Sequence, residues 1–280
     1  VPPDPARSCA NGKVWGVLTG LDLARHDAVV IADDDVRWDE PGLHRALTLL
    51  TCAELVAPVN YYTPLPWQAR YDTARTLLHR ALGVDWPGTL AVRRSALTPA
   101  GGGYDGNVLF ENLELVRTVE AAGGRPVWPP DLFVLRRPPD PAHFIGQRTR
   151  QAYDEFARPA HLVTALAVLP VTLAALATRR RHALLAAALA ATACAELGRR
   201  RAGGRRVFPA SSALLAPVWV LERGICMWLA LWWRLRGGVP YAGTRLRRAA
   251  SRPRDLQRRC AARAAAKQDM NPPLGERSCA

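Results

Sequence analysis

Three consecutive aspartates, Asp33, Asp34 and Asp35, are the strongest chemical signal in this sequence of 280 residues. They follow the apolar run 28–32, which is typical of a strand buried on both faces of a sheet. Because like charges repel, the cluster is unfavourable unless a cation lies between the carboxylates. Oxygen ligands at a strand's carboxyl end suit Mg²⁺ or Mn²⁺ and the phosphates that such an ion holds. The alternative is a solvated acidic turn after a core strand.

The elements that must position these carboxylates follow an alternating order. Helical and strand patterns alternate along residues 1–156 at 14–23, 28–32, 42–52, 55–59, 68–82, 88–92, 111–122, 127–128, 132–135 and 144–157. A strand, an acidic turn, a helix and a second strand predict a layered α/β fold with a largely parallel sheet. The last helix is charged and amphipathic, and a proline-rich break precedes it.

Charge is divided unevenly along the chain. Residues 1–156 carry 16 Lys and Arg against 19 Asp and Glu, whereas residues 157–280 carry 22 against 5. Nearly all of the basic residues are arginines, and Lys13 and Lys267 are the only lysines. In the second half the arginines alternate with long apolar stretches and no nucleic-acid-binding motif is present. The composition therefore favours a membrane partner and no nucleic acid.

Three apolar stretches predict membrane helices between residues 159 and 243. Residues 162–177 and 183–195 carry no charge, and the third stretch, 208–233, is interrupted only by Glu222 and Arg223. The first two are shorter than the roughly 20 residues that span a bilayer, which tilt or arginine snorkelling would accommodate. The alternative is an alanine-rich helical hairpin in a soluble core. The basic tail, residues 244–280, is expected to be disordered or to lie on the membrane surface.

The order of several short motifs resembles the membrane-bound family 2 glycosyltransferases, close to their ceramide glucosyltransferase-like branch. The motifs are Asn-Gly-Lys at 11–13, the aspartates at 33–35, Gly-Thr at 88–89, Gly-Gly-Gly-Tyr at 101–104, Glu-Asn-Leu-Glu-Leu at 111–115, Gln-Arg-Thr-Arg-Gln at 147–151 and Gly-Gly-Val-Pro-Tyr-Ala-Gly at 237–243. The resemblance covers about residues 10–245. It implies a GT-A fold on the cytoplasmic face of the plasma membrane and transfer of a sugar, with inversion, from a nucleotide donor.

The resemblance also implies roles at the donor. Asp35 would bind the Mg²⁺ or Mn²⁺ ion that bridges the donor diphosphate, and Asp33 would face the donor and share the ion. Asp34 belongs to the same donor-binding motif, but its side chain is expected to point away because strand-end side chains alternate. Gln147 and Arg150 would contact the donor phosphates, whereas Gln151 replaces the tryptophan of the family motif. The null hypothesis for Arg150 is a solvated helix face beside anionic lipid.

The acceptor side departs from the family pattern. Gly88 and Thr89 would contact the acceptor. Glu111 and Asn112 occupy the family's Glu-Asp position, whose aspartate is the usual general base. An asparagine cannot take a proton, so Glu111 is the candidate base. The alternative is a helix N-terminus with favourable acidic residues.

The expected organisation is a GT-A-like domain at 1–143, an interfacial helix at 144–158, membrane helices at 159–243 and the basic tail. Only about 30 residues precede the acidic triplet, where the resemblance implies a further β–α–β segment for the nucleotide base. We therefore expect a chain shortened at its N-terminus that binds its donor weakly.

The predicted function is transfer of a sugar from UDP-glucose, a similar UDP-sugar or GDP-mannose to a lipid acceptor at the membrane. Two alternatives stay open. One is a processive polysaccharide synthase, which needs a transmembrane channel. The other is a catalytically inactive membrane scaffold, which Asn112, Gln151 and the short N-terminal part favour.

Overall fold

The computed structural model describes residues 1–83 and 85–270, with mixed strands and helices. The strands are β1 (Ala28–Ala32), β2 (Val36–Arg37), β3 (Leu55–Val56), β4 (Val59–Tyr62), β5 (Thr89–Arg93), β6 (Pro126–Val127), β7 (Phe133–Arg136), β8 (Val239–Tyr241) and β9 (Thr244–Leu246). The helices of the first half are α1 (Gly12–Leu23), α2 (Glu40–Leu49), α3 (Trp67–Leu82), α4 (Glu111–Ala121) and α5 (Pro141–Tyr153). Those of the second half are α6 (Pro159–Ala177), α7 (Arg181–Arg200), α8 (Ala210–Ala213), α9 (Ala216–Leu235) and α10 (Pro253–Met270). Short 3₁₀ turns are η1 (Pro5–Arg7), η2 (Arg94–Ala100), η3 (Asp154–Ala157) and η4 (Arg201–Arg206).

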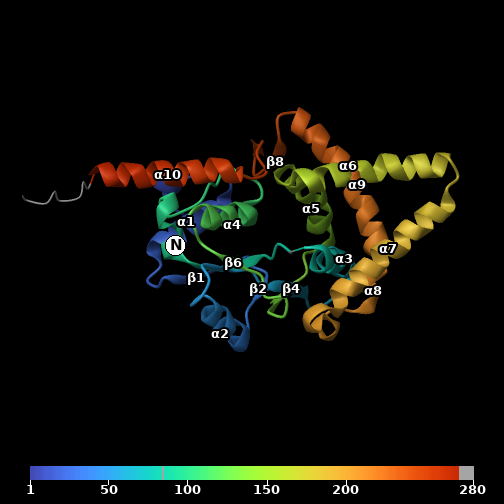
Figure 1. Cartoon of the computed structure of the whole chain (residues 1–280), viewed down its shortest axis with the longest axis horizontal. Coiled ribbons are helices and arrows are strands. Elements are labelled where there is room, and N and C mark those ends of the chain that lie inside the picture. The colour runs from blue at the N-terminus through green and yellow to red at the C-terminus, as the bar shows by residue number, and fades with distance from the viewer. Residues whose placement is uncertain (84, 271–280) are drawn as a thin grey trace, which may run out of the picture.

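The first half is layered, as the sequence predicts, with helices on both faces of a sheet (Figure 1). Side chains alternate along β5, because successive residues of a strand point to opposite faces. Leu90 and Val92 pack with α1 and α4 on one face, whereas Ala91 packs with α2 on the other. The α/β class is confirmed, and this two-sided core holds the carboxyl end of β1 in place.

The prediction of a largely parallel sheet is wrong. The main sheet has the order β1-β5-β3-β6, and β5 runs antiparallel to both of its neighbours while β3 and β6 are parallel. A second sheet, β2-β7-β4, is also mixed. The sequence predicted strands and helices from local patterns, whereas strand direction depends on how β5 enters between two strands that are distant in the sequence.

Strand β1 is likewise not buried on both faces. Of its five residues only Ile31 is buried, and Ala28 and Ala32 are exposed. The reason is its position, since β1 is an edge strand with β5 as its partner in the sheet. The edge leaves the end of β1 open to the space beside the sheet.

The helices of the second half pack on the first half through α3. Helices α3 and α7 cross very closely at Gly198, where an added Cβ would lie 1.9 Å from the carbonyl oxygen of Leu77. Helix α9 contacts α3, α5, α6 and α7, so it occupies the centre of the helical part. This position brings one face of α9 against the sheet-bearing half of the chain.

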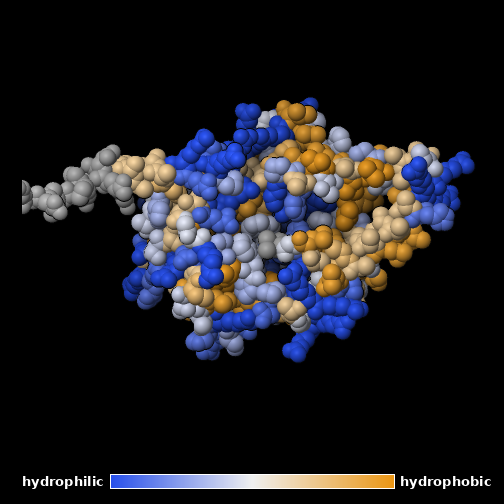
Figure 2. Space-filling model, viewed as in Figure 1, coloured by the Kyte–Doolittle hydropathy of each residue, from blue (hydrophilic) through white to orange (hydrophobic). Residues whose placement is uncertain are grey.

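One of the predicted membrane helices meets the requirements for a span. Among the described residues, α6 is the helix long and apolar enough to cross a membrane, judged by length and composition alone. With α7 it forms an arm that extends from the rest of the chain (Figure 1). Apolar side chains gather over α6, α7 and α9 in Figure 2. Exposed apolar residues of these helices are Val163, Val171, Leu189 and Leu229.

The described part of the tail forms a strand and a helix where the sequence predicts disorder, whereas a position on the membrane surface stays a prediction. Residues 244–246 pair with β8, and α10 packs as a helix against α4 and η2 (Figure 1). The backbone N–H of Ser251 donates to Glu114 Oε2 at 2.6 Å, and Leu256 and Cys260 are buried. These long-range contacts outweigh the arginine-rich composition. Residues 271–280 lie outside the described part.

Candidate functional site

A cavity of about 1090 Å³ lies between the sheet and the helical part. Its lining comes from α1, β1, the end of β4, α3, the loop at 86–88, the start of α4, the end of β7, α5, η3, α9 and β8. Most predicted site residues line it: Asp33, Asp34, Asp35, Gly88, Glu111, Asn112, Gln147 and Arg150. The volume is that of a site for a ligand at least as large as a drug-sized molecule.

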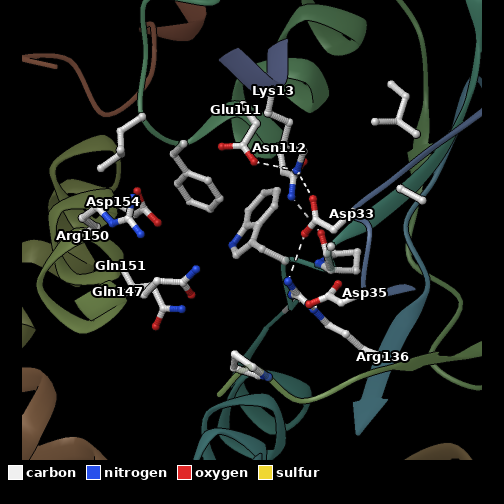
Figure 3. A pocket seen from close by; sticks show the side chains of 18 of the residues that line it. Lys13, Asp33, Asp35, Glu111, Asn112, Arg136, Gln147, Arg150, Gln151 and Asp154 are labelled. Carbon is white, nitrogen blue, oxygen red and sulfur yellow. Dashed lines mark hydrogen bonds and ion pairs between the residues drawn. The ribbon is translucent and has the colours of Figure 1, made fainter. Parts of the chain in front are cut away.

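The strand-end aspartates do have a cation between them, but it belongs to the protein. Arg136, at the end of β7, donates to both oxygens of Asp35 at 2.8 and 3.0 Å and to Asp33 Oδ2 at 3.1 Å (Figure 3). Burial lowers the pKa of Arg136, but Tyr62, Asp35 and Asp33 together raise it above its usual value. Asp34 is exposed, in keeping with the predicted alternation.

A second internal cation, Lys13, joins the start of α1 to the start of α4. Its Nζ lies 2.6 Å from Asp33 Oδ1 and 2.8 Å from Glu111 Oε1. Asn11 caps α1 and accepts a hydrogen bond from the backbone N–H of Lys13 at 3.1 Å. This cap fixes where α1 begins and so holds Lys13 in the first turn of the helix. Burial lowers the pKa of Lys13, but Glu111 and Asp33 raise it above the usual lysine value. Lys13 is therefore a charged bridge between two predicted site residues.

Gly88 lies against the aspartates because it has no side chain. A Cβ at this position would lie 2.6 Å from Asp33 Oδ2 and 2.9 Å from Arg136 Nη1. Its N–H donates to Asn60 Oδ1 at 2.7 Å, and its carbonyl accepts the N–H of Asp33 at 2.8 Å. Gly88 thus brings the loop backbone beside the carboxylates, where it lines the cavity.

Thr89 does not reach the cavity, which argues against the predicted acceptor contact. It is 1% exposed, and its hydroxyl donates to the carbonyl of Ile31 at 2.8 Å. The same oxygen accepts the indole N–H of Trp38 at 3.0 Å. The hydroxyl therefore fastens β5 to β1.

The two residues that depart from the family motifs have structural partners. Asn112 donates to the carbonyl of Pro87 at 2.8 Å and so positions the loop that carries Gly88. Gln151 accepts from Arg148 Nη1 at 2.8 Å. Each amide side chain therefore makes a hydrogen bond that supports the wall of the cavity.

Helix α5 forms the opposite wall. Gln147, Arg150 and Gln151 are seen across the cavity from Asp33 and Asp35 (Figure 3). The guanidinium of Arg150 lies over the ring of Tyr241, 5.8 Å from its centroid, and the Tyr241 hydroxyl donates to Asn11 Oδ1 at 3.0 Å. Burial, and next the nearby Glu111, raise the pKa of Tyr241. These contacts hold Arg150 beside the cavity, away from the aspartates.

Asp154 is a cavity residue that the sequence gave no reason to select. It follows α5 directly, it is half-buried, and no dashed line joins it to another side chain drawn in Figure 3. Burial raises the pKa of Asp154 well above its usual value, and the charges of Glu111 and Glu155 raise it further. A carboxylate with a raised pKa in a cavity is a candidate proton acceptor.

The aspartates suit one mode of metal binding. Across residues 1–83 and 85–270, no group of three or more His, Cys, Asp or Glu side chains is arranged to hold a metal ion. Mg²⁺ sites of nucleotide-binding enzymes often use only one or two carboxylates, with substrate phosphates and water as the other ligands. Asp33 and Asp35 share one cation, with side chains 21% and 25% exposed, and so fit that mode.

Sequence reasoning missed Lys13, Arg136 and Asp154 as site residues. Lys13 had a usable signal, because it is one of two lysines in a chain whose other basic residues are arginines. Arg136 had none, since its partners lie about 100 positions away and only the pairing of β2 with β7 brings them together.

Comparisons with known proteins leave the family open. No model of a known protein family matches the chain, and no curated protein matches it in sequence. Among solved structures it is similar to a mannosyltransferase from Pyrobaculum calidifontis in complex with GDP-Man and Mn²⁺, with 17% identity and a TM-score of 0.39. The match covers 92% of this chain and 66% of the mannosyltransferase, so the chain spans just under two thirds of that protein. A likeness at this TM-score establishes neither family nor activity.

Proposed function

We propose that this chain is a glycosyltransferase that moves a sugar from a nucleotide-sugar donor to a lipid acceptor at a membrane. The observation that carries the proposal is the convergence of Asp33, Asp35, Lys13, Arg136 and Glu111 in one cavity. Departure of a nucleoside diphosphate leaves negative charge behind, and preorganised cations stabilise such charge. The order of the motifs agrees with a family 2 enzyme of inverting type.

In the proposed reaction an acceptor hydroxyl attacks the anomeric carbon of the donor sugar. The bond from that carbon to the diphosphate breaks, the diphosphate leaves with the electron pair, and a carboxylate takes the hydroxyl proton. Glu111 is the base proposed from the sequence, although Lys13 holds one of its oxygens at 2.8 Å. Asp154 is the alternative base, because it lines the same cavity with a raised pKa.

Asp33 and Asp35 would hold Mg²⁺ or Mn²⁺ together with the donor phosphates, and the bound ion would supply positive charge opposite the departing diphosphate. Lys13 and Arg136 add positive charge from the protein side, and Gly88 lets the loop backbone approach closely. Arg150, Gln147 and Asp34 stay proposed donor contacts.

Membrane association is a second part of the proposal. It is supported by α6, which has the length and composition of a span, and by the exposed apolar side chains over α6, α7 and α9. Arginines 179–181 lie where α6 joins α7, at the end of the arm. We propose that this arm enters the lipid of the plasma membrane and that the cavity faces the cytoplasm.

The test is sugar transfer by the purified full chain, with UDP-glucose and GDP-mannose as donors and detergent-solubilised membrane lipids as acceptors. Asp35→Ala is expected to abolish transfer, because it removes one of the two carboxylates that share a cation. Asp22→Ala, at an exposed ion pair with Arg7, is the matched control. Wild-type turnover by Asp35→Ala would remove Asp35 from the mechanism.

A catalytically inactive scaffold is the second candidate, and one observation favours it. Lys13 and Arg136 already neutralise the strand-end acids, so the cluster is stable as an internal ion-pair network. A scaffold predicts neither sugar transfer nor slow donor hydrolysis, with or without chelator, in any variant.

A further inference from the structure

Arg223 is a buried guanidinium that forms no ion pair within the described residues and has the ring of Trp219 as a cation–π neighbour. It lies on α9, is 6% exposed, and its Nε and Nη1 atoms make no hydrogen bond within the described part of the chain. Arginine is almost never buried in this way unless it is paired, because removing a charge from water is costly. An orphaned buried charge therefore calls for an explanation.

The other two arginines that are buried among the described residues have hydrogen-bond partners. Arg80, 4% exposed, donates to the carbonyls of Gly198, Pro130 and Arg201. Arg148, also 6% exposed, is paired with Glu222 at 2.8 Å and Asp72 at 3.2 Å. Glu222, the neighbour of Arg223 in sequence, is thus taken by Arg148.

Further unpartnered donors line the same cavity. Trp219, one helical turn before Arg223, and Trp86 have indole N–H groups without a partner among the described residues, and Arg158 has an unpartnered Nε. All four side chains line the cavity. Indole and guanidinium groups can only donate hydrogen bonds. Trp219, Arg223 and Arg158, on the helical side of the cavity, are therefore complementary to a ligand that only accepts hydrogen bonds.

We propose that Arg223 and Trp219 bind a phosphate group inside the cavity. A phosphate offers several acceptor oxygens and negative charge, and a guanidinium fork matches its geometry. The guanidinium carbon of Arg223 lies 5.0 Å from the centroid of the Trp219 ring, so the two donors belong to one place on α9. The choice of phosphate rests on the proposed function, but the binding itself requires no transfer reaction.

The phosphate has two possible sources, the diphosphate of the donor and a phosphate group on a lipid acceptor. Arg223 belongs to the helical part, whose outer surface is apolar, whereas Asp33 and Asp35 belong to the sheet. One face of α9 lines the cavity, whereas other side chains of the same helix, such as Ile225 and Leu229, are exposed. A soluble and a lipidic phosphate probe distinguish the two sources.

Glu155 offers the competing explanation. Its Oε2 also lacks a hydrogen-bond partner among the residues that the structure describes, and its Oε1 accepts from Arg158 at 2.8 Å. A water molecule that bridges Glu155 to Arg223 would give the arginine a purely structural role. The two explanations differ in what removal of Arg223 does to the ligand-free protein.

The first measurement is calorimetric titration of the full chain in neutral detergent with pyrophosphate, dodecyl phosphate and dodecanol. Arg223→Met is expected to weaken phosphate binding roughly tenfold or more, as loss of a charge-assisted hydrogen bond implies. Arg236→Met makes the same change at an exposed site of the same segment and is expected to keep wild-type affinity. Preference for dodecyl phosphate identifies a lipid phosphate, and preference for pyrophosphate identifies the donor diphosphate or free phosphate. Equal binding of dodecanol overturns the proposal.

The second measurement is the thermal midpoint without ligand. Removal of an unpaired buried charge is expected to leave the midpoint of Arg223→Met at or above the wild-type value. Arg148→Met is the destabilised reference, because it removes the ion-pair partner of Glu222 and one of the two ion-pair partners of Asp72. If Arg223→Met is destabilised like Arg148→Met and keeps wild-type phosphate affinity, Arg223 is structural and the proposal is wrong.

A third variant keeps the proposal testable if Arg223→Met does not fold. Trp219→Phe keeps an aromatic ring beside Arg223 but removes the unpartnered N–H. Trp219→Phe is expected to weaken binding of the same phosphate probe severalfold. Sugar transfer by this variant is assayed separately. Unchanged phosphate affinity in Trp219→Phe would contradict the assigned site, whatever the outcome of the transfer assay.

Discussion

Removal of Arg136 tests most directly whether the strand-end aspartates depend on a cation for stability. Arg136→Met removes three hydrogen bonds to Asp33 and Asp35, between 2.8 and 3.1 Å long. Breaking a buried pair costs about 3–5 kcal/mol, because the remaining charges lose their partner. The three side chains are 21–25% exposed, so solvent screening reduces this cost. We expect a loss of about 2 kcal/mol in the free energy of unfolding.

The assay is thermal unfolding followed by circular dichroism, with and without Mn²⁺. A loss of about 2 kcal/mol lowers the midpoint by about 4–8 °C for a domain near this size. If Asp33 and Asp35 can share a divalent ion, Mn²⁺ should raise the midpoint of Arg136→Met more than that of the wild type, because the ion replaces the missing cation. Arg137→Met, at the exposed neighbouring position, is the matched control.

One result would refute both the stabilising role of Arg136 and the cation site. If Arg136→Met unfolds at the wild-type temperature and Mn²⁺ does not stabilise it, then the aspartates neither depend on Arg136 nor form a cation site. Destabilisation without a response to Mn²⁺ would keep the ion-pair network and remove the metal.

Three further predictions concern the base, the pH dependence of stability and the membrane. If Asp154 is the base, the transfer rate should rise with pH through the raised pKa of Asp154. Asp154→Asn should abolish this rise and lower the transfer rate about 10²–10⁴-fold. The same loss in Glu111→Gln but not in Asp154→Asn would assign the base to Glu111. Because the pKa of Asp154 is raised in the folded state, folding stability should fall as pH rises from its usual value through the raised one, and Asp154→Asn should abolish this decline in unfolding experiments. If α6 enters lipid, exchange of its exposed Val163 and Val171 for Gln should reduce flotation of the chain with liposomes, whereas exchange of the exposed Thr164 should not.

Local signals explain the parts of the fold that the sequence predicted well. Helix α1 begins after the capping Asn11, and α4 ends before Gly123, whose φ of 88° lies in the left-handed region that glycine favours. Strand β5 was located correctly, but its direction between β1 and β3 has no local signature. Helix α10 shows the same limit, because its place depends on contacts such as that of Ser251 with Glu114, 137 positions away.

In the candidate site, too, the residues marked by local motifs were predicted and those placed by long-range contacts were not. The acidic triplet and Glu111 were found because short motifs mark them, and the structure brings them into one cavity. Their counter-ions Lys13 and Arg136 were missed, since an ion pair across about 100 residues leaves no periodic pattern. Thr89 shows the converse: a motif located the residue, but only the packing of β5 against β1 shows that its hydroxyl is already used.

The charges of the cavity indicate why two phosphate sites would respond differently to a metal ion. At the strand end the paired cluster contains three carboxylates and two cations, a formal charge of −1: Asp33, Asp35, Glu111, Lys13 and Arg136. Such an end repels a diphosphate unless a divalent ion changes its formal charge to +1. The helical side of the cavity contains four arginines and three carboxylates, a formal charge of +1 without any metal: Arg75, Arg150, Arg158, Arg223, Asp72, Asp154 and Glu155. A chelator should therefore release a phosphate bound at the strand end and leave one bound at Arg223 in place. A chelator-sensitive Arg223 site would mean that a single ligand spans both ends.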